Sequence, residues 1–214
     1  MVPVPPWSVV VPAKRLAVAK TRLRPLTAAL GDTTHDELVL ALLADTVAAA
    51  MGCPPVAEVV VVTDDPAAAD AVRPLGARTV ADEPDRGLNP ALEHGARNAA
   101  HPAVAALSSD LPALRSAELA AALRAAAADP RCFVPDVSGT GTTLLAAVGV
   151  ALRPSFGRAS AQAHRDGGAR CLSGAWPGLA RDVDTPDDLR EALALGAGPR
   201  TSAVVERLGR PVPR

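Results

Sequence analysis

Short apolar runs alternate with helix-like segments along this chain, and this alternation limits the possible folds more than any other feature. The segments WSVVVPAK and EVVVVTDD contain continuous β-branched runs, a pattern typical of strands that are buried on both faces of a sheet. Strands that alternate with helices favour parallel βαβ units. The sequence therefore predicts an α/β fold, a three-layer α/β/α sandwich around a mostly parallel mixed sheet.

The expected strands lie at residues 7–11, 58–63, 77–80, 104–107, 132–135, 143–148 and 180–183. The expected helices lie at about residues 34–51, 66–75, 89–100, 116–128, 159–167 and 186–195. Asp65 and Thr185 each precede a proline, so we expect each of them to cap a helix. Residues 1–196 are expected to form a single domain, and residues 197–214, with little periodicity, a C-terminal tail.

The composition disfavours several classes of function. The 22 Lys and Arg residues nearly balance 23 Asp and Glu residues, and aromatic residues make up only 2%, so we expect no nucleic-acid partner. No apolar run reaches the roughly 18–20 residues of a membrane span, and we expect neither a signal peptide nor a membrane partner. Cys53, Cys132 and Cys171 have no zinc or redox spacing, which favours reduced thiols and a cytoplasmic location.

A cluster of cations follows the first predicted strand within eleven residues, with no acid before Asp32: Lys14, Arg15, Lys20, Arg22 and Arg24. Ligands of such sheets bind beyond the carboxyl ends of the strands, and cations there suit a polyphosphate. A solvated basic helix face is the alternative, and no dinucleotide or Walker glycine motif is present. We expect phosphate contacts from Lys14 and Lys20, which no nearby acid should pair, and a surface position for Arg15 and Arg24.

Carboxylates that follow two other predicted strands are candidates for a metal site. Asp110 follows the strand at 104–107, where a carboxylate is costly unless it is hydrated, paired or bound to metal; a turn residue before Pro112 is the alternative. Asp182 and Asp184 share one face of the strand expected at 180–183, and Asp182 is the second candidate, with Asp184 left open. Because Mg²⁺ in phosphate sites usually takes one or two protein carboxylates, Mg²⁺ is the expected cofactor.

Three further segments predict binding of a second anion and of a base. The backbone amides of SGTGTTLL can form an anion nest, and FGRASAQAH places Gly157 and Ser160 at a helix start, where Ser160 is alternatively a cap. His164 is expected at the surface or the rim. In ADEPDRGLNP, Gly87 permits a tight turn, and Asn89 either reads a base edge or caps the next helix. Together these features indicate Mg²⁺-dependent attack of a phosphate on a nucleoside triphosphate, with no nucleophilic side chain.

Seven segments occur here in the same order as in the guanylyltransferases of deazaflavin coenzyme F-420 biosynthesis: VVVPAKRLAVAKTRL, VVVVTDD, EPDRGLN, SSDLP, GTGTTLL, FGRASAQAH and RDVDTPDDL. The chain resembles this family over about residues 7–193. The resemblance implies a fold similar to nucleotide-diphospho-sugar transferases. It also implies transfer of GMP from GTP to the phosphate of phosphoenolpyruvate or 2-phospho-L-lactate, with release of pyrophosphate and possible hand-over of the product to the next enzyme. The Ala-, Arg-, Pro- and Gly-rich composition indicates a GC-rich, actinobacterial source. Actinobacterial members of this family use phosphoenolpyruvate, so the composition favours phosphoenolpyruvate as the acceptor.

The resemblance also implies a set of site residues. The acceptor is assigned to Thr142, Gly157 and Ser160, the metal to Asp110 and Asp182, and catalysis to Lys14, Lys20 and Asp110. The nucleotide is assigned to Pro12, Ala13, Lys14, Lys20, Arg22, Pro84, Gly87 and Asn89. Two alternatives remain: a molybdenum-cofactor or sugar-phosphate nucleotidyltransferase, which usually opens with a glycine-rich AGG--R loop, and a regulatory module that binds GTP without turnover.

Overall fold

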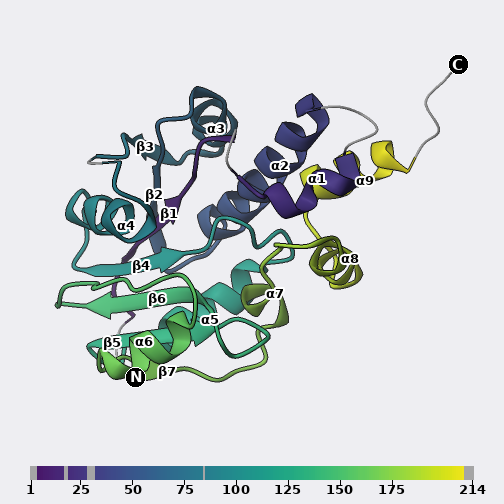
Figure 1. Cartoon of the computed structure of the whole chain (residues 1–214). Coiled ribbons are helices and arrows are strands. Elements are labelled where there is room, and N and C mark those ends of the chain that lie inside the picture. The colour runs from purple at the N-terminus through teal and green to yellow at the C-terminus, as the bar shows by residue number, and fades with distance from the viewer. Residues whose placement is uncertain (1–3, 17–18, 28–31, 84, 210–214) are drawn as a thin grey trace, which may run out of the picture.

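The fold is built on one twisted sheet (Figure 1), seen in a computed structural model that describes residues 4–16, 19–27, 32–83 and 85–209. Within these residues the sheet has seven strands in the order β3-β2-β1-β4-β6-β5-β7. The strands are β1 (Trp7–Pro12), β2 (Val56–Val62), β3 (Arg78–Val80), β4 (Ala103–Leu107), β5 (Arg131–Pro135), β6 (Thr142–Val148) and β7 (Arg170–Cys171). Strands β1 to β4 are parallel, whereas β6 runs antiparallel to β4 and β5. The mixed, mostly parallel sheet is therefore confirmed.

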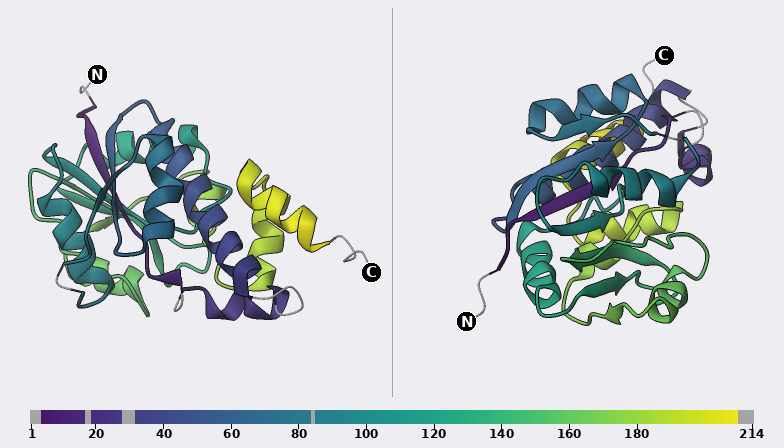
Figure 2. Two further views of the ribbon diagram at one scale, coloured as in Figure 1. Left: turned by 90° about the horizontal axis from the view of Figure 1, so that it is seen from above. Right: turned by 90° about the vertical axis from the view of Figure 1, so that its left-hand side faces the viewer.

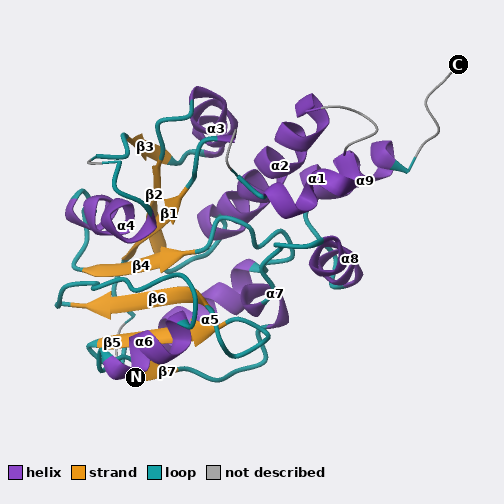
Figure 3. Cartoon of the chain, in the orientation of Figure 1, coloured by secondary structure: helices purple, strands orange, loops and turns teal. Residues whose placement is uncertain are grey.

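Helices cover both faces of this sheet (Figure 3). Helices α2 (Asp32–Met51), α3 (Pro66–Val72), α5 (Ser116–Ala126) and α7 (Pro177–Ala180) contribute to the core on one face, and α4 (Leu88–Arg97) and α6 (Ser160–Asp166) to the core on the other. Successive residues of β1 divide between the two cores, because Val9 and Val11 face the first and Val10 faces the second. The predicted three-layer sandwich is therefore confirmed.

Gly95 lets α4 pack unusually close to the centre of the sheet. A Cβ atom at this position would lie 2.4 Å from Cγ1 of Val10 and 2.7 Å from Cγ2 of Val62, both in the rigid core. No larger residue fits without moving the helix. The close approach fixes α4 over β1 and β2, so that its N-terminal end lies near the carboxyl ends of these strands.

A third core joins the N-terminal half of α2 to α8 (Pro186–Ala194) and α9 (Pro199–Leu208), which lie together at one end of the molecule (Figure 2). The short elements η2 (Thr21–Leu23) and α1 (Arg24–Thr27) precede α2 here. The buried carboxylate of Asp45 on α2 accepts hydrogen bonds from the backbone N–H groups of Thr201 (2.8 Å) and Arg200 (3.3 Å). The segment predicted as a tail therefore includes a helix that is packed and capped against α2.

The sequence placed most elements correctly but was wrong at one strand. The last strand was expected at residues 180–183, but Ala180 ends α7 and residues 181–183 have irregular backbone; the last strand is instead β7 beside β5. The apolar signal in this segment came from Leu179 and Val183, which are buried against helices. The caps by Asp65 and Thr185 are confirmed. None of the helices in the described ranges combines the length and the apolar character needed to cross a bilayer.

Candidate active site

A cleft of about 890 Å³ opens at the carboxyl ends of β1 and β4 and extends to the start of β6. Its volume is that of a small-molecule site. Ten of the predicted site residues line it: Pro12, Ala13, Lys14, Lys20, Arg22, Asp110, Thr142, Gly157, Ser160 and Asp182. Gly87 lines a smaller cavity of about 490 Å³ that adjoins the cleft at residues 12–14. Pro84 lies outside the described residues.

Lys20 forms the electrostatic centre of the cleft. Its Nζ donates to Oδ2 of Asp110 and, at 2.5 Å, to Oδ1 of Asp184. Burial opposes the ammonium charge, but the two carboxylates outweigh this effect and raise the pKa of Lys20 above its usual value. The expectation that no acid pairs with Lys20 is therefore wrong. Its partners are distant in the sequence, and only the fold brings them to the same strand ends.

The backbone that leads to Lys20 is held by two neighbouring elements. Lys20 itself has a left-handed conformation, with φ of 48°, which is uncommon for a residue with a side chain. On one side, Nε2 of the buried His35 lies 3.1 Å from the carbonyl oxygen of Ala19, to which it donates. On the other side, the N–H of Leu16 donates to Oδ2 of Asp65 at 2.9 Å. The loop after β1 is therefore anchored to α2 and α3.

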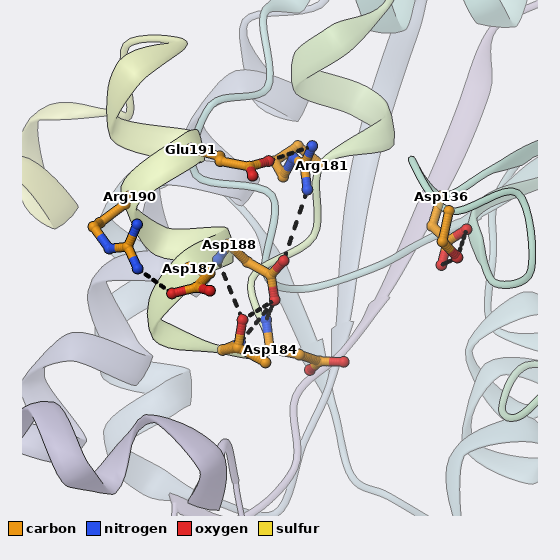
Figure 4. Close-up of polar contacts among 9 residues, drawn as sticks. Asp136, Arg181, Asp184, Asp187, Asp188, Arg190 and Glu191 are labelled. Atoms are coloured by element: carbon orange, nitrogen blue, oxygen red, sulfur yellow. Dashed lines mark hydrogen bonds and ion pairs between the residues drawn. The ribbon is translucent and has the colours of Figure 1, made fainter.

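The loop that carries Asp182 and Asp184 is fixed by α8 and by the segment after β4. The N–H of Val183 donates to the carbonyl oxygen of Asp110 at 3.1 Å. The carboxylate of Asp188, the third residue of α8, accepts from the N–H of Asp184 at 3.2 Å, as Figure 4 shows. The guanidinium of Arg181 also contacts the carboxylate of Glu191, which lies on α8, at 2.5 Å. The capping of α8 therefore brings both aspartates to the cleft without a strand.

The charges around Asp182 and Asp184 shift the pKa values of these two residues in opposite directions. Burial, followed by the charges of Asp110 and Asp184, raises the pKa of Asp182 to about 7. Burial also acts on Asp184, but the nearby cation of Lys20 outweighs it and lowers the pKa of Asp184. Among the described residues no three potential ligands surround a common point. The oxygen donors nevertheless fit Mg²⁺, which binds through few carboxylates and completes its shell with phosphate and water.

The other end of the cleft presents hydroxyl groups. Ser160 is 1% exposed, lines the cleft, and forms no hydrogen bond through its hydroxyl to any other described residue. The cap of α6 is Ala159, so the alternative role of Ser160 as that cap is wrong. Gly157 has φ of +128°, which strongly favours glycine. Oγ1 of Thr142 lies 2.9 Å from Nδ1 of His164.

The SGTGTTLL loop does not present the free anion nest that its sequence suggests. Asp136, directly after β5, accepts from the N–H of Thr140 at 3.0 Å and from Oγ of Ser138 at 2.9 Å. This carboxylate, seen beside the site in Figure 4, occupies the loop as an internal anion. Its position directly after a strand is a signal that the sequence contained; Asp110 similarly follows β4, after two serines.

Two residues near these hydroxyl groups have surroundings different from those predicted. Gly87, not Asn89, caps α4. The amide of Asn89 donates to the carbonyl of Phe156 at 3.0 Å and accepts from its N–H at 2.7 Å, and its nucleotide contact stays a prediction. His164 is 2% exposed and therefore not at the surface. It follows Ser160 by four residues, a spacing that places both on one helix face.

Solved structures of low sequence identity share the fold. A protein of Desulfovibrio desulfuricans G20, assigned to the nucleotide-diphospho-sugar transferases, superposes with a TM-score of 0.65 at 16% identity, covering 95% of this chain and 98% of that one. The Rv0371C protein of Mycobacterium tuberculosis, solved in complex with manganese, superposes with a TM-score of 0.53 at 20% identity, covering 90% and 100%. The fold is thus that of nucleotide-diphospho-sugar transferases.

The sequence comparison identifies the family. The family described as "Guanylyl transferase CofC like" matches residues 7–213. The phosphoenolpyruvate guanylyltransferase of Geodermatophilus obscurus is 68% identical over 213 residues, which cover 99% of each chain. The chain therefore belongs to the CofC-like guanylyl transferase family and is a nucleotidyltransferase, as its resemblance to the F-420 guanylyltransferases predicted.

Proposed function

We propose that this chain transfers GMP from GTP to the phosphate of phosphoenolpyruvate, which yields enolpyruvyl-diphospho-guanosine and pyrophosphate. The supporting observation is that one cleft combines a cationic end, with Lys14, Lys20 and Arg22, and a hydroxyl end, with Thr142 and Ser160. We call these the phosphate end and the acceptor end. The name of the Geodermatophilus relative supports phosphoenolpyruvate as the acceptor, and 2-phospho-L-lactate is the alternative.

In this reaction a phosphate oxygen of the acceptor attacks the α-phosphorus of GTP, and the bond to the leaving pyrophosphate breaks. Both reactants are anions, so their repulsion must be offset and their geometry fixed. Lys14, Lys20 and Arg22 bind the triphosphate, and the flexible stem of Lys20 lets its ammonium turn from the carboxylates to a phosphate oxygen. Mg²⁺ held by Asp110 and Asp182, with Asp184 beside them, would neutralise further phosphate charge.

The guanine base is proposed to bind in the smaller cavity beside Gly87, which Pro12 and Ala13 connect to the cleft. Carboxylates of Asp64 and Asp82 line this cavity. Guanine presents N–H donors on its Watson–Crick edge that such carboxylates can accept. The segment around Pro84 belongs to the same predicted base site. We place the reaction in the cytoplasm, consistent with three free cysteines, and leave hand-over to the next enzyme as part of the proposal.

A pyrophosphate-release assay tests this function. The purified chain is incubated with GTP and Mg²⁺, together with phosphoenolpyruvate, with 2-phospho-L-lactate or with no acceptor. We expect pyrophosphate release that requires an acceptor and is faster with phosphoenolpyruvate. If neither acceptor causes pyrophosphate release, the proposal is wrong. GTP binding without pyrophosphate release would support a regulatory module instead. Faster release with 2-phospho-L-lactate would reassign the acceptor.

A further inference from the structure

His164 lies at the junction of four segments around the acceptor end. It belongs to α6, and its ring lies against Phe133 of β5, with ring centroids 5.7 Å apart, and edge-on to Phe156, at 5.2 Å. Nδ1 lies 2.9 Å from Oγ1 of Thr142 at the start of β6. Nε2 lies 2.9 Å from the backbone nitrogen of Ser155. Both ring nitrogens of this buried side chain are therefore used.

The partner of Nε2 fixes the tautomer of the ring. The Ser155 backbone nitrogen carries a hydrogen and can only donate, so Nε2 must supply the lone pair. A neutral imidazole that accepts at Nε2 carries its proton at Nδ1. That proton is donated to Oγ1 of Thr142. The tautomer therefore follows from the contact between Nε2 and the backbone N–H of Ser155.

The same logic fixes the direction of the Thr142 hydroxyl. Its oxygen accepts from His164, so its own hydrogen is available for another acceptor. Among the described residues no other hydrogen bond involves this hydroxyl, and Thr142 lines the cleft. A hydroxyl that lines a cleft and has a free hydrogen suits an anionic ligand, because a carboxylate or phosphate oxygen only accepts.

We propose that His164 is a positioning residue that holds Thr142 as a hydrogen-bond donor to the phosphorylated acid and fixes the Ser155–Gly157 loop beside it. This inference rests on the proposed function, because it assigns the acceptor to this end of the cleft. His164 touches neither substrate. It acts through Thr142 on one side and through the backbone of Ser155 on the other.

The neutral state of the ring agrees with this geometry. Burial, followed by the nearby positive charge of Arg131, lowers the pKa of His164 to about 4. A protonated ring would place a second N–H against the N–H of Ser155, which leaves both donors unsatisfied. His164 therefore stays neutral near pH 7 and keeps the same donor and acceptor assignment throughout catalysis.

Two substitutions separate the two hydrogen bonds of His164. In His164→Gln the terminal amide lies near the position of Nε2, so it can still accept from Ser155 but no longer reaches Thr142. In His164→Asn the shorter amide lies near the position of Nδ1, so it can still donate to Thr142 but no longer accepts from Ser155. We expect the first variant to raise the KM for the phosphorylated acid about tenfold, the second about twofold, and neither to change the KM for GTP.

Thr142→Val supplies the partner variant for a double-mutant cycle. If His164 acts through the hydroxyl, adding His164→Gln to Thr142→Val should change the acceptor KM by less than about twofold. His94→Gln, which changes a histidine of α4 bonded to Asn98, is the control and should leave both KM values unchanged. Three results would overturn the inference. They are an equal rise of the acceptor KM in the His164→Gln and His164→Asn variants, additive effects of His164→Gln and Thr142→Val on the acceptor KM, and equal shifts of the KM values for the acceptor and GTP.

Nitrogen NMR of histidine-labelled wild-type protein tests the tautomer independently of the kinetics of any variant. We expect a neutral ring protonated at Nδ1 for His164, assigned by the loss of its signals in His164→Gln. A ring protonated at Nε2 or at both nitrogens near pH 7 would overturn the inference. A wild type that releases no pyrophosphate overturns the proposed function, whereas an active wild type with unchanged acceptor KM in His164→Gln overturns only the role of His164.

Discussion

The two ends of the cleft are held by different kinds of interaction. At the phosphate end, Lys20 is paired with the carboxylates of Asp110 and Asp184. At the acceptor end, Thr142, His164, Asn89 and the Ser155–Phe156 backbone form neutral hydrogen bonds at 2.7–3.0 Å. One end therefore contains charges that a triphosphate and a metal can reorganise. The other is a neutral network whose donors are already directed.

The difference indicates how each end responds to substitution. Loss of a charge at the phosphate end removes stabilisation of the reacting phosphates, where electrostatic effects on turnover are large. Loss of one neutral hydrogen bond at the acceptor end costs about 1 kcal/mol and shifts the affinity for one substrate. Substitutions at the phosphate end should therefore change turnover, and those at the acceptor end should change a single KM.

The largest effect is expected for Asp110→Asn, which preserves shape and removes the charge. Turnover in the pyrophosphate assay should fall about a thousandfold. The free energy of unfolding should fall by about 3 kcal/mol or less, because the pair with Asp110 is buried but Lys20 keeps Asp184 as a partner. Asp187→Asn is the matched control, since Asp187 is exposed and paired with Arg190, and it should retain full activity. Near-normal turnover in Asp110→Asn would contradict the metal assignment.

Lys20→Met should lower kcat/KM for GTP about a hundredfold, because an uncharged side chain cannot neutralise the triphosphate. The KM for the phosphorylated acid should change much less. Arg24→Gln removes a cation from the same segment whose partner, Asp32, is exposed, and it should behave like wild type. Equal losses in the two variants would indicate that the cluster acts only through its general positive field.

The pH dependence of stability tests the neutral network. The pKa of His164 in the folded chain is about 4, below the usual value of 6.5. Between pH 6.5 and pH 4, His164 is therefore protonated in the unfolded chain but neutral in the folded chain. The stabilisation is thus present above pH 6.5 and is lost as the pH falls towards 4, by about 2–3 kcal/mol. Chemical denaturation of wild type and His164→Gln above pH 6.5 and near pH 4 measures this loss of stability. Parallel pH profiles would show that His164 titrates normally.

The smallest effect is expected for Asn89→Asp, which removes the donor to the carbonyl of Phe156. The KM for the phosphorylated acid should rise about tenfold or less, while the KM for GTP stays unchanged. Asn98→Asp, at the other end of α4, is the control. A selective rise in the KM for GTP would instead support the contact between Asn89 and the nucleotide that the sequence predicted.

Much of the fold was predictable because it depends on local patterns. Continuous apolar runs such as that of β2 identify buried strands, and Asp65 with its following proline identifies a helix start. The prediction failed at residues 180–183, since burial by helices produces the same apolar signal as a strand. It also missed α9, whose contacts with α2 lie far away in the sequence.

For the site, the sequence determined which side chains follow the strands, and ten of the predicted residues line one cleft. Residue type and position after a strand are local properties, so Lys14, Lys20 and Asp110 could be selected without a structure. Only the tertiary structure decided the partners. It paired Lys20 with Asp110 and Asp184, directed Asn89 to Phe156, and buried His164 against Thr142. These contacts join segments separated along the chain, so ionisation and hydrogen-bond direction are set by the fold.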